Sequence, residues 1–334
     1  MYIISNYSLA VFFCIITMLC WGSWGNTQKL AAKNWRYELF YWDYVIGIVI
    51  LSLIFGFTLG SIGDLGRSFT SDLFQVRSAN VLSAILGGII FNASNILLSA
   101  SISIAGMAVA FPLGVGLALV LGVVINYIST PKGDPLILFL GVALIVVAIV
   151  FNGIASGKMS RGERKSSSKG IWLAIIAGIL MSFFYRFVAA AMDINNFESP
   201  TPGLATPYTA FFIFSIGMLI SNVVFNTLIM KRPFVGTPVT YKEYFSGSIS
   251  THMVGIVGGL IWGLGTVLNY MAAGKAGAAI SYALGQGATM VAAFWGVFIW
   301  KEFKGADKAI NLLLFLMFVL FITGLGLIIM SGGN

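Results

Sequence analysis

Charged residues are scarce in this chain of 334 residues, and their scarcity decides its class. Only 9% of the residues are Asp, Glu, Lys or Arg, whereas a soluble domain carries about 25%. A chain with so little charge cannot cover a globular surface with groups that water solvates. Hydrophobic residues make up 58% of it and the mean hydropathy is +0.95. We therefore expect a lipid bilayer to be its main solvent.

Cysteine and histidine are nearly absent, which removes several kinds of site. The only cysteines, Cys14 and Cys20, share one apolar run, where packing is the expected role rather than a disulfide or a metal pair. The single histidine, His252, begins another apolar run, and we interpret it as an interfacial side chain rather than a proton relay. Without metal-ligand spacing or a catalytic triad, we expect no metal, no cofactor and no enzyme activity.

Signals for nucleotide and nucleic acid binding are also missing. The segment GIASGKMS at 153–160 is similar to a phosphate-binding loop, but its glycines are too close together and Met159 replaces the Ser or Thr that would bind magnesium. The isoelectric point is near 9.5, yet the basic residues are spread over short loops. We therefore expect neither ATP-driven pumping nor a nucleic acid partner.

What the sequence does contain is a series of apolar runs, each of about the 20 residues that cross a bilayer as a helix. The runs are continuous rather than alternating, which excludes a transmembrane β-barrel. The first six residues lack the positive charge of a cleavable signal, so we interpret the first run as a retained span. The prediction is an all-α integral membrane protein with ten spans: roughly 7–28, 38–60, 79–103, 105–127, 135–156, 170–193, 206–229, 250–273, 276–299 and 308–331.

The loop charges predict an orientation in the membrane. Counted alternately along the chain, the loops on one side carry 14 Lys and Arg and those on the other side carry 4. Positive residues stay on the cytoplasmic side, so both termini are expected outside the cytoplasm. No loop is long enough to hold a separate domain, which argues against a receptor or a membrane enzyme.

The hydrophobic pattern runs through the sequence twice. Residues 86–127 align without a gap on residues 257–298, at a constant offset of 171 that matches five pairs of glycines: Gly87 with Gly258, Gly88 with Gly259, Gly106 with Gly277, Gly114 with Gly285 and Gly116 with Gly287. Because each half holds five spans, an odd number, the second half must enter the membrane from the opposite side. We predict two inverted repeats, 1–156 and 170–334, joined by a basic cytoplasmic linker at 157–169.

Two charged residues inside spans are candidates for function, because a charge at the bilayer centre costs about 2.5–3.5 kcal/mol on insertion scales. Arg186 in the sixth span could hold a solute carbonyl or carboxylate through paired hydrogen bonds, and a buried structural ion pair is the alternative. Asp43 in the second span could bind and release a coupling proton. The alternative for Asp43 is an interfacial acid that only meets cytoplasmic water.

Three spans each present neutral polar residues on one helix face near the predicted midplane. These faces are Asn92, Asn95 and Ser99; Trp262, Thr266 and Asn269; and Tyr282, Gln286 and Thr289. Polar residues can simply hold helices together, but aligned faces in repeat-related spans favour the lining of a shared site. Trp21 and Trp24 would add aromatic walls that suit a planar heterocycle or the apolar face of a sugar.

Five segments, in this order along the chain, resemble a known family: FYWDY at 40–44, GGIIFNASN at 87–95, PYTAFFIFS at 207–215, GGLIWGLGTVLNYMAAGKAG at 258–277 and AAFWGVFIWKE at 292–302. With them the chain resembles the drug/metabolite transporter superfamily, whose members have ten helices in two inverted repeats. Within it the ureide permeases are most similar, and bacterial glucose/ribose and rhamnose uptake transporters are more distant. The resemblance implies proton-coupled import of allantoin and related nucleobase-like compounds. It also implies that Asp43 is the family's acidic residue in span two and that Asn95 is its span-three asparagine.

Two departures from the family pattern bear on specificity and source. The family's long central cytosolic loop is represented here only by 157–169, and Thr266 stands where the span-eight motif has an asparagine. A loop this short is typical of a bacterial protein, so we expect a location in a bacterial inner membrane.

The resulting hypothesis is a secondary active importer of a small polar metabolite, working by alternating access and coupled to a proton or sodium gradient. Its coupling site is Asp43, and its substrate site lies between the halves at Trp24, Asn92, Asn95, Arg186, Trp262, Asn269, Tyr282 and Gln286. Monosaccharide uptake is the first alternative, because Asn, Gln and Arg side chains also bind hydroxyl groups. Export of drugs or metabolites is the second, although a positive, amide-rich site would suit lipophilic cations poorly.

Overall fold

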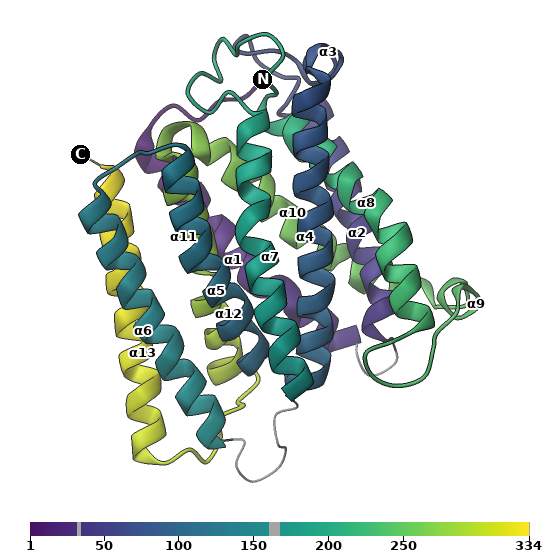
Figure 1. Ribbon diagram of the computed structural model, residues 1–334, viewed down its shortest axis with the longest axis vertical. Helices are drawn as coiled ribbons and strands as arrows, with labels where there is room; N and C mark the ends of the chain where they lie inside the picture. The colour runs from purple at the N-terminus through teal and green to yellow at the C-terminus, as the bar shows by residue number, and fades with distance from the viewer. Residues whose placement is uncertain (32–34, 160–167, 334) are drawn as a thin grey trace.

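The computed structural model describes residues 1–31, 35–159 and 168–333, and they fold into a bundle of helices. Ten of the helical segments are long and apolar enough to cross a membrane, as the sequence predicts. Within the described ranges the β structure is limited to a single bridge between Met192 and Ala205. Both termini lie at one end of the bundle, together with the short helix α3 (Phe69–Gln75) (Figure 1), as an even number of crossings requires.

The spans follow one another with short connections. The first half contains α1 (Tyr7–Ala31), α2 (Tyr37–Phe57), α4 (Ser78–Ala105), α5 (Met107–Ser129) and α6 (Pro135–Met159). The second half contains α7 (Ser168–Ala191), α8 (Pro207–Lys231), α10 (Ile249–Ala276), a segmented ninth span and α13 (Lys308–Gly332). The ninth span is built from α11 (Ala278–Gln286), α12 (Ala288–Phe294) and the π-helical turn η2 (Trp295–Ile299).

Two features of the fold go beyond the sequence prediction. The short helices α3 and α9 (Tyr241–Phe245) occupy two of the connections. The ninth span is interrupted at Gly287 and ends in η2, a form that recurs at functional sites. Of the linker predicted at 157–169, residues 160–167 lie outside the described residues, and the division into two halves stays a prediction.

The two ends of the bundle can be told apart by the polar contacts found at each. At the end with both termini, the N-terminal ammonium group donates to the carbonyl oxygen of Leu65 at 2.6 Å. At the opposite end Lys29 pairs with Glu302 at 2.6 Å, and Arg36 donates to the carbonyl oxygens of Val235 and Thr237. We call these the terminal end and the basic end. The side of the membrane that each end faces stays a prediction.

Glycines allow the helices of the two halves to approach each other in the same way twice. α4 packs against α7 and α8, and its repeat equivalent α10 packs against α1 and α2. A Cβ atom on Gly88 would lie 2.2 Å from the carbonyl oxygen of Phe214, and one on Gly259 would lie 2.0 Å from that of Tyr44. Only glycine permits such close backbone contacts. The repeated pairing is consistent with two inverted repeats.

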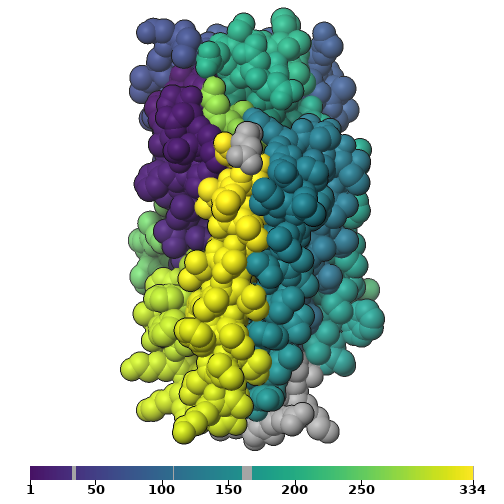
Figure 2. Space-filling view, turned by 90° about the vertical axis from the view of Figure 1, so that its left-hand side faces the viewer, coloured from purple at the N-terminus to yellow at the C-terminus, as the bar shows by residue number. Residues whose placement is uncertain are grey.

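The breaks between helices follow the same relationship. Gly106 joins α4 to α5 at the basic end, and Gly277 joins α10 to α11 at the terminal end. Both residues have a φ angle of +83°, which favours glycine because a Cβ atom would be strained there. Equivalent breaks at opposite ends are expected of inverted halves. The last spans of the halves, α6 and α13, lie side by side along the molecule (Figure 2).

Candidate functional site

A cavity lies inside the bundle where α1, α4, α5, α7, α10 and the ninth span meet. We call it the central cavity. Twelve residues line it: Trp21, Trp24, Phe91, Asn95, Leu98, Phe111, Val115, Met181, Phe184, Trp262, Gln286 and Ala288. All twelve are neutral and most are apolar, so the cavity suits an uncharged solute better than an ion.

Aromatic rings form its flattest surface. Trp262 stacks on Trp21, with 5.9 Å between ring centroids and 10° between planes, and on Phe91, with 4.4 Å and 28°. The Trp21 indole donates a hydrogen bond to the Thr266 hydroxyl at 3.0 Å, which fixes its orientation. Trp24 packs on Tyr44 at 4.8 Å. Parallel, fixed rings offer a stacking surface to a planar solute.

Two amides supply the polar groups of the central cavity. Asn95 projects from α4, and its side-chain NH2 group donates to the Tyr41 hydroxyl at 3.3 Å. Gln286 is the last residue of α11, next to the interruption at Gly287. An amide both donates and accepts hydrogen bonds, so two amides can pair with the edge of a compound that carries adjacent N–H and C=O groups.

The structure brings together four of the eight residues that the sequence assigns to the substrate site: Trp24, Asn95, Trp262 and Gln286. Three others are buried but hold helices together instead. Asn92 donates to the Ser221 hydroxyl at 3.0 Å and Asn269 donates to the carbonyl oxygen of Ser281 at 2.8 Å. Tyr282 lies within hydrogen-bonding distance of the carbonyl oxygens of Ala118 and Met181, at 3.1 and 3.3 Å.

Arg186 does not reach the cavity, which corrects the sequence interpretation. Its side chain is exposed on the outer surface of α7, whereas the adjacent Tyr185 is fully buried. Successive helical residues are rotated by about 100°, so the face that carries Phe184 and Tyr185 inward turns Arg186 outward. Because α7 ends at Ala191, its long side chain can extend along the helix to the polar edge of the membrane.

Sequence reasoning missed several lining residues, one of which the repeat could have identified. Phe91 lies 171 residues before Trp262, so the offset assigns the two residues to equivalent positions. Met181 and Phe184 line the cavity from α7 with the same three-residue spacing that Trp21 and Trp24 have on α1, but the offset of 171 does not relate these two pairs. Their apolar side chains gave no polar signal in the sequence.

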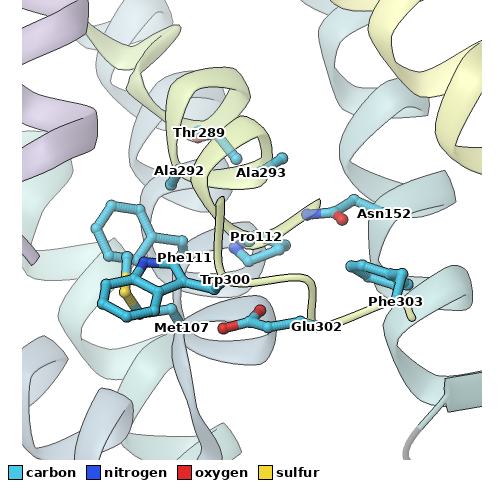
Figure 3. Close-up of a pocket in the computed structure, with 11 residues that line it drawn as sticks. Met107, Phe111, Pro112, Asn152, Thr289, Ala292, Ala293, Trp300, Glu302 and Phe303 are labelled. Carbon is cyan, nitrogen blue, oxygen red and sulfur yellow. The ribbon is translucent and has the colours of Figure 1, made fainter. Parts of the chain in front are cut away.

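Two further cavities lie between the central cavity and the basic end, and neighbouring cavities share lining residues. A large vestibule at that end is lined by residues that include Lys29, Trp35, Met107 and Glu302. A middle cavity shares Met107 and Glu302 with the vestibule, and it shares Phe111 with the central cavity. Figure 3 shows Met107, Phe111 and Trp300 gathered on one side of the middle cavity, with Asn152 and Phe303 on the other.

The route is narrow in this conformation. The volume open to the centre of a water molecule is about 390 Å³ in the vestibule, about 10 Å³ in the middle cavity and about 30 Å³ in the central cavity. By this measure one water molecule needs roughly 10–15 Å³. The side chains of Met107 and Phe111 therefore close the passage, and the central cavity must expand before it can hold a solute.

Polar contacts join the connecting segments at the terminal end. Asp72 of α3 is fully buried, pairs with Arg67 at 2.7 Å and accepts a hydrogen bond from the backbone N–H of Thr206. Arg67 also donates to the carbonyl oxygens of Pro200 and Leu204. These contacts tie the connection between α7 and α8 over the helix ends, so the described residues favour access from the basic end.

Asp43 lies outside the central cavity, in a cluster near the basic end. One of its carboxylate oxygens accepts a hydrogen bond from the Tyr244 hydroxyl at 2.7 Å and lies 2.8 Å from Nδ1 of His252. The other accepts from the Trp35 indole at 3.3 Å. Burial, followed by the adjacent Asp43, raises the pKa of Tyr244, so its hydroxyl remains a donor. Sequence reasoning treated His252 as an interfacial side chain and missed Tyr244.

Comparison with known proteins identifies similar chains. The family model described as ureide permease matches residues 40–167 and 161–331. Ureide permease 1 of Arabidopsis thaliana is 23% identical over 390 residues, and the match covers 100% of both chains. Ureide permease 5 of the same plant is 24% identical, with 100% of this chain and 96% of the relative covered.

Two more distant similarities extend the comparison. A protein of Lactiplantibacillus plantarum named for sugar uptake is 20% identical, over 89% of this chain and 90% of its own length. One solved crystal structure shares the fold, with a TM-score of 0.57 at 14% identity, and covers 97% of this chain and 98% of its own.

Proposed function

Because the chain belongs to the ureide permease family, we propose that it is a secondary active transporter for a small, neutral, hydrogen-bonding solute. It imports this solute by alternating access, with the central cavity as the binding site. The observation that carries the proposal is the chemistry of that cavity, in which the twelve described lining residues include stacked indoles and two amides and none of the twelve is charged. A membrane bundle with an apolar, occluded cavity at the meeting of its halves is typical of secondary transporters.

A ureide or a nucleobase-like compound fits this chemistry best. Such compounds are compact and flat, so one face can stack on Trp262 and Trp21. Their edges carry alternating N–H and C=O groups, which pair with the donors and acceptors of Asn95 and Gln286. The names of the two plant relatives reported above support the same class.

A monosaccharide is the second candidate, and the similarity to a bacterial sugar uptake protein favours it. A sugar ring also presents an apolar face to tryptophan, but it needs partners for several hydroxyl groups. The central cavity offers two amides for this purpose. Export of lipophilic cations receives less support, because the described residues place no carboxylate in the lining of the cavity.

We assign the coupling proton to Asp43, which is 2% exposed and bridges α2 to α9 and α10.

We assign the basic end to the cytoplasmic side of the membrane, which would place both termini on the outer side. For a bacterial protein this membrane would be the inner one. Single cysteines at the exposed residues Asp64 and Lys304, in a chain with Cys14 and Cys20 replaced by Ala, test this orientation. An impermeant maleimide added to cells should label Asp64→Cys and leave Lys304→Cys unmodified.

Counterflow into proteoliposomes tests the function directly. Vesicles loaded with unlabelled solute are placed in labelled allantoin, uracil, ribose, glucose or rhamnose at equal pH on both sides. We expect exchange of allantoin or uracil to exceed that of the sugars. Exchange of ribose, glucose or rhamnose alone would favour the second candidate, and a lack of exchange with all five compounds would contradict the proposal.

A further inference from the structure

His252 and Asp43 form a close pair at a contact between the predicted halves. Asp43 belongs to α2 of the first half, and His252 belongs to α10 of the second. The imidazole Nδ1 lies 2.8 Å from the carboxylate, whose residue is only 2% exposed. A Cβ atom on Gly255 would lie 2.5 Å from the Asp43 Cβ, so the two helices are nearly in backbone contact here. Any change in this pair therefore acts on the α2–α10 interface.

The surroundings of the pair restrict its chemistry. Asp43 accepts hydrogen bonds from Tyr244 of α9 and from Trp35, which precedes α2. α1, α4 and α8 also pack against α2, but within the described ranges none of them supplies an ion pair or hydrogen bond to Asp43. The Trp35 and Tyr244 rings contact the imidazole edge-on, at 5.2 and 4.8 Å. His252 is thus the one basic group that the described residues bring to this carboxylate.

The two side chains of the pair differ in exposure, since that of His252 is partly exposed and that of Asp43 is buried. His252 is 22% exposed, and the described residues form no hydrogen bond to its Nε2 atom. Trp35 also lines the basic-end vestibule. Nε2 can therefore take a proton from water at the basic end, while Nδ1 keeps its contact with Asp43.

The pair is also connected to the central cavity through α2. Tyr41, two residues before Asp43, accepts the hydrogen bond from Asn95, which lines the cavity. Tyr44, which follows Asp43, packs on Trp24 and Trp262. A displacement of α2 at Asp43 would consequently move polar and aromatic groups that contact the solute.

We propose that His252 and Asp43 together carry the coupling proton, with Tyr244 and Trp35 as positioning residues; the proposal rests on the transport function argued above. Uptake of one proton at Nε2 converts a neutral imidazole beside a carboxylate, with net charge −1, into a pair with net charge 0. The new N–H bond replaces an O–H bond of a hydronium ion in the water at the basic end, and no other bond changes. A buried net charge is costly, so the neutral pair allows α2 and α10 to move against each other more easily.

Transport measurements on matched variants test the coupling. His252→Asn keeps an N–H donor near the position of Nδ1 but cannot carry a proton, and Asp43→Asn removes the charge. We expect both to retain allantoin counterflow at equal pH within about threefold of the original protein. Both should lose at least tenfold in accumulation driven by a pH gradient that is acidic on the side of solute addition. Accumulation by His252→Asn equal to that of the original protein would overturn the proposal.

Nuclear magnetic resonance of the single histidine provides a readout that needs no solute. In protein labelled with 15N-histidine, one imidazole contributes the signal. At high pH we expect the proton on Nδ1, because the carboxylate accepts from it, and on acidification a second proton on Nε2. Asp43→Asn should displace this titration, and Tyr244→Phe should displace it less. An imidazole that titrates identically with Asn at position 43 would exclude a shared proton, whatever the transported solute proves to be.

Discussion

Phe91 and Trp262 occupy equivalent positions 171 residues apart, and their rings stack on each other with 4.4 Å between centroids. Each ring comes from the glycine-rich helix of its half, α4 or α10. The predicted inverted repeats would place their pseudo-twofold axis close to this contact. On that prediction each half contributes one ring to the same wall of the central cavity.

Replacing Trp262 tests whether this wall binds the solute. Trp262→Ala should weaken allantoin binding about tenfold, because an aromatic pair contributes about 0.5–1.5 kcal/mol beyond the buried area. Trp262→Phe, which makes the two positions identical, should retain most of the affinity. Equilibrium binding to purified protein measures the effect. Trp172→Ala is the control, since Trp172 is 63% exposed on the outer surface of α7.

The amides of α4 separate solute binding from helix packing. Asn95 lines the cavity, whereas Asn92, almost one turn away, bonds to Ser221 of α8. Asn95→Leu should weaken allantoin binding by about 2–12-fold, the equivalent of one hydrogen bond of about 0.5–1.5 kcal/mol. Asn92→Leu should lower the melting temperature and leave affinity unchanged. If both variants bind like the original protein, hydrogen bonding by Asn95 is not part of recognition.

Arg186 is a residue whose substitution should leave solute transport almost unchanged. Because its side chain is exposed on α7, Arg186→Gln should change counterflow by less than about twofold, as surface substitutions away from special features have small effects. Proteoliposome exchange at equal pH measures this, with Asn95→Leu as the impaired reference. A loss in Arg186→Gln as large as in Asn95→Leu would show that the arginine contacts the solute in another conformation.

These residues show how much of the fold and of the candidate site could be predicted from the sequence. The ten spans could be predicted because a chain in lipid must satisfy its backbone hydrogen bonds within helices. The repeat offset also located the glycine contacts at Gly88 and Gly259, since close packing leaves no room for a side chain. Trp24 and Gln286 were identified because large aromatic and amide groups are conspicuous in apolar helices.

The remaining errors have a common physical cause. A polar residue in an apolar span stands out in the sequence. Whether its side chain faces the cavity or a neighbouring helix depends on how the helices are rotated about their axes, which the sequence does not show. Asn92 and Asn95 differ in role because Ser221 of α8 faces only the first of them. Tyr244 lies on a short helix that is 201 residues from Asp43 in sequence, and its hydroxyl group donates a hydrogen bond to the Asp43 carboxylate. That helix carries a Thr-x-x-Glu capping signal at Thr240, which is a visible sign of its start in the sequence.

The capping box of α9 makes the position of Tyr244 sensitive to acid. The Glu243 carboxylate accepts hydrogen bonds from the hydroxyl and backbone N–H of Thr240, and these lower the pKa of Glu243 below its ordinary 4.5. A lowered pKa in the folded state means that this stabilisation is present above pH 4.5 and is lost as the pH falls through the lowered value. The ionised form is therefore the one that orders α9 at neutral pH.

Glu243→Gln should reproduce the protonated state at neutral pH. We expect faster hydrogen–deuterium exchange in residues 240–248, because the substitution removes the charge-assisted hydrogen bonds of the cap. Glu198→Gln is the control, since Glu198 is a largely exposed acid at the terminal end. Equal exchange in the two variants would mean that packing of Tyr244, rather than the cap, holds this helix.

The last prediction concerns Phe111 and Tyr282, which are also equivalent by the offset of 171 but do not make equivalent contacts. Phe111 narrows the route from the basic end and has no hydroxyl group. Tyr282, toward the terminal end, shares its hydroxyl proton between the carbonyl oxygens of Ala118 and Met181. Within the described residues, the terminal side is thus held by a tyrosine hydrogen bond that Phe111 cannot make on the basic side.

Tyr282→Phe should shift the protein toward opening at the terminal end, by roughly the 2–12-fold that corresponds to one hydrogen bond of about 0.5–1.5 kcal/mol. The readout is the rate at which an impermeant maleimide modifies Ala288→Cys in the central cavity, in a chain without Cys14 and Cys20. Reagent added at the terminal end should react faster in Tyr282→Phe. Phe111→Ala should accelerate labelling only from the basic end. If Tyr282→Phe leaves labelling from the terminal end unchanged, the hydroxyl does not lock that side, and the asymmetry must arise from the Arg67–Asp72 contacts instead.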